Sequence, residues 1–206
     1  MKKLWIIVLS LVTVVSACFA ETSTQKDIHK LVKKEVKRLA KEGWMVSPGA
    51  LPLEKQLERA YLMQYEQDEN QSPRYIMGEA SSVGDSYDSA KADAMSLAIT
   101  NLAAHIQSEV TALIEHQVED RRISQEDAKS ISETVMASQD LISKSIGRAI
   151  PVMECYRTTR QKDSEVLIRI AYDAEMAKEA ARQAVRDELA KKGNHLHEQL
   201  DTVLGF

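Results

Sequence analysis

The stretch that decides the fold is residues 86–118, SYDSAKADAMSLAITNLAAHIQSEVTALIEHQV, which contain neither glycine nor proline. Apolar side chains recur in it every three or four residues, the spacing of one face of an α-helix: Ala90, Ala94, Ala98, Leu102, Ile106, Val110 and Leu113. At 1.5 Å per residue, the predicted helix is about 50 Å long. A seven-residue strand spans only about 23 Å, so this helix should extend past any sheet that it covers and need a second partner.

That partner is predicted directly after a polar turn at residues 119–122. Ser124 and Asp127 form an S-x-x-D capping pattern, and Ile123 and Ala128 flank it as a hydrophobic staple would. An apolar stripe continues from there, and we expect one long helix that ends at Gly147. Because the turn is short, the two helices should be antiparallel neighbours in an α-helical hairpin, protruding over residues 107–139.

Three strands complete the expected core. The first covers residues 74–80 and is followed by a turn at 81–85, while residues 149–157 and 165–172 form a hairpin with a polar loop. Alternation along the third strand should direct four side chains to the core: Val166, Ile168, Ile170 and Tyr172. Asp173 should cap a last helix. The order β-α-α-β-β-α predicts an α+β fold, in which long helices cover one face of a small three-stranded antiparallel sheet.

Four parts are predicted along the chain: a signal peptide (1–20), an N-terminal helical segment and linker (21–72), the α+β core domain (73–192) and a tail that forms a short helix (193–206). The N-terminal segment holds an amphipathic helix at residues 26–42, rich in lysine, and a short helix at 52–65. The lysines of the first helix suit either a solvated face of a packed helix or contact with anionic head groups.

The beginning of the chain predicts export. Lys2 and Lys3 precede an uncharged apolar run from Leu4 to Val15, a pattern typical of a secretory signal peptide and too short for a transmembrane helix. Cys18 follows Ser16 and Ala17 as in a bacterial lipobox, which makes Cys18 the lipidation candidate of an outer-membrane lipoprotein. Ordinary cleavage after Ala20 would instead release a free periplasmic protein, and both alternatives remain open.

Composition excludes several classes of function. Seven Gly and four Pro in 206 residues are about 5% of the chain against roughly 12% on average, which argues against many-turned all-β folds and leaves no glycine-rich phosphate loop. Without Lys2 and Lys3 the chain has 25 basic and 31 acidic residues, a net charge of −6 that disfavours nucleic acid as a partner.

No catalytic, cofactor-binding or metal-ligating residue is predicted. The sequence contains neither a G-x-S-x-G nor an H-E-x-x-H motif. On a helix, His105 and His116 would be separated by about 16 Å of rise, too far to share one ion, and His195 and His197 would point away from each other. Cys155 lies in a strand-like apolar stretch and is expected to be a buried, inert side chain.

Parts of this pattern resemble a known family. The strand Tyr75-Ile76-Met77-Gly78-Glu79-Ala80, the alanines at fourfold spacing in the long helix, and the strand from Val166 to Ala171 resemble the LPP-type family of small bacterial envelope lipoproteins. Relatives of that family include the N-terminal domain of the flagellar assembly protein T. The resemblance covers residues 74–189 and implies a compact domain with a small antiparallel sheet against long helices, an envelope location and a role in surface antigens or appendage assembly, without catalysis.

We therefore expect a non-enzymatic cell-envelope protein that binds other envelope proteins as a structural or assembly component, anchored to the membrane if Cys18 is acylated. Exposed sheet edges and the protruding hairpin would offer the surfaces that bind these partners. The protein could also form a homo-oligomer. The alternative is a periplasmic carrier of a small ligand or lipid, held in a groove between the helices and the sheet.

Overall fold

The computed structural model describes residues 25–120, 122–192 and 194–204. It begins with a helix at residues 25–41, called here the N-terminal helix. The other elements are α2 (Leu53–Tyr65), β1 (Tyr75–Gly84), α3 (Tyr87–Glu119), α4 (Gln125–Ala137), α5 (Gln139–Ser145), β2 (Ile150–Thr158), β3 (Ser164–Asp173), α6 (Ala174–Lys192) and α7 (Asn194–Leu204). The predicted α+β fold with a three-stranded antiparallel sheet is confirmed.

The sheet has the strand order β1-β3-β2, with β3 in the centre and antiparallel to both neighbours. Gly78 of β1 stands opposite Ile170, and Cys155 of β2 stands opposite Leu167. The four side chains predicted to face the core from β3 are all buried: Val166, Ile168, Ile170 and Tyr172. Asp173 accepts hydrogen bonds from the backbone N–H groups of Glu175 and Met176, as expected of the cap of α6.

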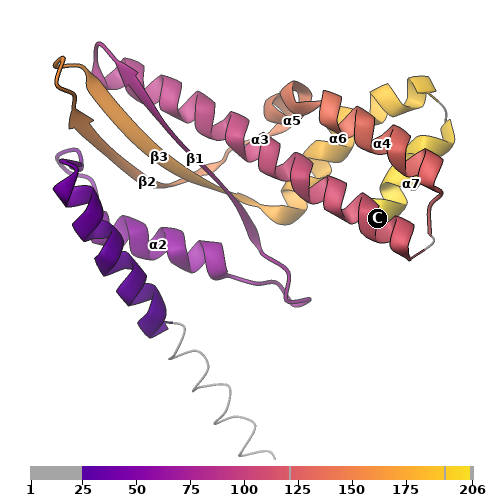
Figure 1. Ribbon diagram of the computed structural model, residues 1–206, viewed down its shortest axis with the longest axis horizontal. Helices are drawn as coiled ribbons and strands as arrows, with labels where there is room; N and C mark the ends of the chain where they lie inside the picture. The colour runs from indigo at the N-terminus through magenta and orange to yellow at the C-terminus, as the bar shows by residue number, and fades with distance from the viewer. Residues whose placement is uncertain (1–24, 121, 193, 205–206) are drawn as a thin grey trace, which may run out of the picture.

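One face of the sheet is covered by the first half of α3, which lies along β1 and β3 (Figure 1). The buried side chains of this half are small near the sheet: Ala90, Ala94 and Ala98 are fully buried. Gly78 makes the close approach feasible, because a Cβ at this position would lie 2.5 Å from the carbonyl oxygen of Ala98 and 2.9 Å from Leu102 Cβ. Small residues on both elements therefore let the helix lie directly on the strand.

The second half of α3 extends past the sheet, where α4, α6 and α7 pack around it (Figure 1). Ile106, Val110 and Ile114 are buried in this bundle. The predicted helix of about 33 residues and its antiparallel partner α4 are confirmed, and Ser124 caps α4 through a bond from the Asp127 N–H. The hairpin does not protrude alone, because α6 and α7 also line it.

The expectation of a single long second helix was wrong. It is broken at Ser138 into α4 and α5. The amide of Gln107 on α3 donates to the carbonyl oxygens of Val135 and Met136, at 2.7 Å each, and the Ser138 hydroxyl donates to the Thr134 carbonyl. These side chains satisfy carbonyls at the end of α4, so the helix ends without glycine or proline.

The first strand is longer than predicted, because Ser81–Gly84 continue β1 instead of forming a turn. They pair with Leu167–Ser164 of β3. Polar residues are tolerated here since β1 is an edge strand whose outer side faces water. Gly84 is needed at the end, where a Cβ would lie 2.8 Å from the Ala90 nitrogen in the first turn of α3.

Helices cover both faces of the sheet, contrary to the expectation of one face. The N-terminal helix and α2 lie on the face opposite α3 (Figure 1). Their buried side chains, including Val32 and Leu57, pack with Met153 and Cys155 of β2. This packing crosses the predicted boundary between residues 72 and 73, which itself remains a prediction. The second face is filled because Leu167 and Ala171, on the outer side of the predicted alternation, are also apolar.

The tail forms the expected helix, α7, with Leu196, Leu200 and Val203 buried. The predicted signal peptide with Cys18, and Gly193, lie outside the described residues. Among the helices that are described, none combines the length and apolar character that crossing a bilayer requires.

Candidate functional site: a groove between β1, α3 and α6

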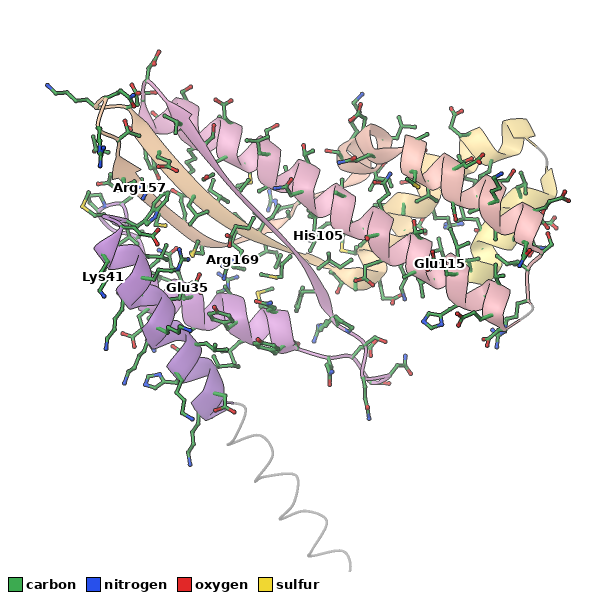
Figure 2. All side chains as sticks on the ribbon, viewed as in Figure 1. Glu35, Lys41, His105, Glu115, Arg157 and Arg169 are labelled. Atoms are coloured by element: carbon green, nitrogen blue, oxygen red, sulfur yellow. The ribbon has the colours of Figure 1, made fainter. Side chains whose placement is uncertain are left out.

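A groove of about 430 Å³ lies where the bundle meets the start of β1. Three elements form its walls: the first residues of β1, the middle of α3 from His105 to Leu113, and the first turn of α6. The loop that joins α2 to β1 closes one end through Asp68, Ser72 and Pro73. Figure 2 shows His105 beside β1, at the point where α3 leaves the sheet.

The floor of the groove is apolar. It consists of the buried side chains Ile106, Val110 and Ala177, together with the half-buried Ile76 and Leu113. The floor is apolar because the apolar side of α3 continues past the sheet, where β1 diverges from the helix. Such a floor favours apolar groups of a bound molecule.

The rim of the groove is charged and mainly acidic. Glu109 and Asp68 lie at its mouth, and Lys178 is paired with Glu175 at 2.7 Å. Asp68 also accepts hydrogen bonds from two backbone N–H groups of its own loop. The rim therefore complements a molecule that carries positive charge beside an apolar part.

The outer edge of β1 is capped by α3. His105 Nδ1 lies 2.6 Å from the carbonyl oxygen of Met77, and Asn101 Nδ2 donates to the carbonyl oxygen of Glu79 at 2.8 Å. A carbonyl oxygen only accepts, so this nitrogen of His105 carries a proton. Two acceptors that an added strand would need are thus already occupied.

The outer edge of β2 is capped as well. Met45 and Tyr156 exchange two backbone hydrogen bonds of 2.8 Å, and the N–H of Glu154 donates to Gln56 Oε1 at 2.7 Å. Side chains and the 44–51 loop thus occupy these positions on both edges, so the expectation that open sheet edges offer a partner-binding surface is not met there. The groove is the better candidate.

A buried ionic network lies on the other face of the sheet, and the sequence did not reveal it. Arg169 of β3 contacts Glu35 of the N-terminal helix at 3.2 Å and Glu79 of β1 at 2.5 Å, while the side chains of Arg169 and Glu35 are each 12% exposed. The Tyr61 hydroxyl donates to Glu35. Burial, reinforced by this bond, raises the pKa of Tyr61 to about 12. The network joins the N-terminal helix and α2 to the sheet and is structural.

In a smaller hollow beside β2, the polar side chains that line it form hydrogen bonds with one another. The Tyr87 hydroxyl and Lys91 Nζ both donate to Glu154, and the Ser47 hydroxyl donates to Tyr87. Burial and the bond to Glu154 raise the pKa of Tyr87. Because each of these groups is paired, the hollow offers little to a ligand.

The residues singled out in the sequence do not converge on a reactive centre. Cys155 is 1% exposed as predicted, and burial raises the pKa of its thiol to about 12. His105 caps β1, whereas His116 lies at the far end of α3, 3.7 Å from Glu119. Over the part of the chain that is described, no three His, Cys, Asp or Glu side chains gather as a metal site would require.

Comparison with known proteins adds no relative: no family model, no curated protein and no solved structure matches this chain. The groove therefore has to be interpreted from its own chemistry.

Proposed function

We propose that this chain is a non-enzymatic binding protein of the bacterial cell envelope, whose groove holds an apolar segment of a partner protein. The observation that carries the proposal is the apolar floor, in which the half-buried Ile76 and Leu113 lie over the buried Ile106 and Val110, beneath a mainly acidic rim. The expected partner segment presents apolar side chains flanked by Lys or Arg. The capped sheet edges support a groove, and not strand addition, as the mode of binding.

The test uses a photoreactive benzophenone side chain in the cell that produces the protein. We place it at Glu109, on the rim of the groove, and as a control at Glu115, which is exposed on the same helix but does not line the groove. A protein adduct formed from position 109 and absent from position 115 is expected. The same adducts from both positions, or none from position 109, would rule out the groove as a protein-binding site.

The second candidate function is a carrier of a small amphipathic molecule. It is favoured by the size of the groove, since about 430 Å³ falls in the range of small-molecule pockets. Native mass spectrometry of the purified protein decides between the two. A bound small molecule that is lost on Leu113→Glu, together with no protein adduct from position 109, would assign the carrier function.

The envelope location is part of the proposal and rests on the sequence of residues 1–20. If Cys18 is the acylated first residue of the processed chain, metabolic labelling with palmitate marks the wild type and not Cys18→Ala. Equal labelling of the two proteins would contradict acylation of Cys18 and favour the alternative, a free periplasmic protein. Membership of the LPP-type family is proposed on the β1 and α3 residues that resemble it, with Gly78 at their close contact.

A further inference from the structure

The outward face of the N-terminal helix consists only of lysine. With 3.6 residues per turn, successive residues are rotated by 100°, and the buried positions Ile28, Val32 and Leu39 point in one direction. On the opposite side, an arc of about 100° contains six residues and no others, all of them exposed: Lys26, Lys30, Lys33, Lys34, Lys37 and Lys41. We call this set the lysine face.

The packing fixes the direction in which the lysine face points. The buried side of the helix contacts β2, and Glu35 on that side is paired with Arg169 of β3. Figure 2 shows Glu35 on the side of the helix toward the sheet and Lys41 on the outer side. Because the opposite side of the helix is packed against the sheet, the lysine side chains point away from the protein.

The lysine face is not explained by helix stability. Only Lys30 has an acidic partner, Asp27 at 3.2 Å; among the residues that the structure describes, the other five lysines have none within 4.0 Å. Their spacings of three and four residues bring like charges together, as in Lys33 and Lys37, which destabilises a helix. A surface selected only for solubility mixes both signs, so this concentration of one sign points to an anionic partner.

The charge of the rest of the chain indicates the shape of that partner. Residues 26–41 contain seven basic and two acidic side chains, a net +5, whereas the whole chain has a formal net charge of −4. The remainder is thus acidic and would be repelled by any partner that wraps around the protein, as a nucleic acid does. A flat surface can contact the lysine face while the acidic remainder stays away from it.

We propose that the lysine face binds the surface of a membrane containing anionic phospholipids, with the N-terminal helix parallel to the membrane plane. The helix is about 25 Å long and contributes charge without a deep apolar contact, because its apolar side is buried against the sheet. Binding is electrostatic and sensitive to salt. It depends on neither the groove nor acylation of Cys18.

The experiment uses the chain from Glu21 onward, which keeps every described residue and lacks Cys18. Co-sedimentation is measured with vesicles of equal parts phosphatidylglycerol and phosphatidylcholine, and with vesicles of phosphatidylcholine alone. The variant K33E/K37E/K41E reverses three unpaired charges. The matched control K129E/K144E/K162E makes the same change in net charge at exposed lysines that have no acidic partner within 4.0 Å in the described structure.

Binding to the anionic vesicles is expected to fall by on the order of 100-fold in K33E/K37E/K41E, to persist within about twofold in the control, and to weaken as salt shortens the Debye length. Circular dichroism should show that both variants remain folded, since all six substituted lysines are exposed.

Three results would overturn the proposal. Equal binding to phosphatidylcholine alone would show that lipid charge is not recognised. An equal loss in K129E/K144E/K162E would show that net charge, and not the lysine face, governs binding. Binding to a short DNA duplex as tight as to the anionic vesicles, lost in the same variant, would assign the face to polyanions in general.

Discussion

His105 Nδ1 lies 2.6 Å from the carbonyl oxygen of Met77, so a side chain of the long helix α3 occupies an acceptor on the outer edge of β1. One helical turn earlier, Asn101 does the same for Glu79. Edge strands with free acceptors and donors are templates for pairing with another chain. The helix that covers this sheet therefore also protects these positions of its edge from pairing with another strand. This leaves the groove beside the edge as the candidate binding site.

Removing both caps should promote self-association. For Asn101→Ala/His105→Ala we expect a loss of roughly 1–3 kcal/mol in the free energy of unfolding, because each bond contributes about 0.5–1.5 kcal/mol. Sedimentation velocity should reveal dimers and larger species at concentrations where the wild type is unchanged. Ser108→Ala, at an exposed position on the same helix, serves as the control. A double variant that associates no more than this control would show that the caps do not protect the edge.

Gly78→Ala should destabilise the protein by about 1–3 kcal/mol. The added Cβ would meet the Ala98 carbonyl oxygen at 2.5 Å, and this atom belongs to the backbone of α3 and cannot rotate away. Urea denaturation measures the loss. Gly147→Ala is the control, since its Cβ would have only the Tyr172 hydroxyl nearby, at 3.8 Å. Equal stabilities of the two variants would mean that β1 and α3 do not approach as closely as described.

Arg169→Met should cost about 3 kcal/mol of the free energy of unfolding, because it leaves the nearly buried Glu35 with only the exposed Arg38 at 3.4 Å and the Tyr61 hydroxyl as partners. Loosening of the N-terminal helix should appear as faster hydrogen exchange in residues 25–41. Lys55→Met, which breaks the exposed pair with Glu58, should leave stability almost unchanged. If the two substitutions had similar effects, the network would not join the helix to the sheet.

Stability should decline at high pH through Cys155. Its pKa is raised to about 12 in the folded chain, so the folded thiol keeps its proton in a range where the unfolded chain loses it. The contribution is complete below about pH 9 and is lost as the pH rises toward 12, with a slope of up to about 1.4 kcal/mol per pH unit. Cys155→Ala should flatten the dependence of the urea midpoint on pH above 9. An unchanged slope would show that another group causes the decline, Tyr61 being the first to examine.

The sequence predicted the features that depend on local spacing. The stripe from Ala90 to Leu113 indicated α3 because its 33 residues repeat one pattern, and the alternation in β3 indicated its buried side. The break at Ser138 could not be predicted, since it depends on Gln107, which is 28 residues from Val135 in sequence.

Long-range contacts limited the prediction of the candidate site in the same way. Glu35 and Arg169 are 134 residues apart, and the groove unites β1, α3 and α6, each of which looks ordinary alone. Three apolar residues of its floor, Ile106, Val110 and Leu113, belong to the α3 stripe, so their pattern is that of a core. Ile106 and Val110 line the groove although each is only 1% exposed, so the sequence does not distinguish them from core residues.

The most direct test of the groove is the yield of the photo-adduct from position 109 in two matched backgrounds. Leu113→Glu places a charge in the wall of the groove, whereas Leu97→Glu places one on the same helix at an exposed position outside it. With both variants shown to be folded by circular dichroism, the account predicts that the adduct disappears with Leu113→Glu and persists with Leu97→Glu. An adduct that forms at wild-type yield despite Leu113→Glu would contradict it.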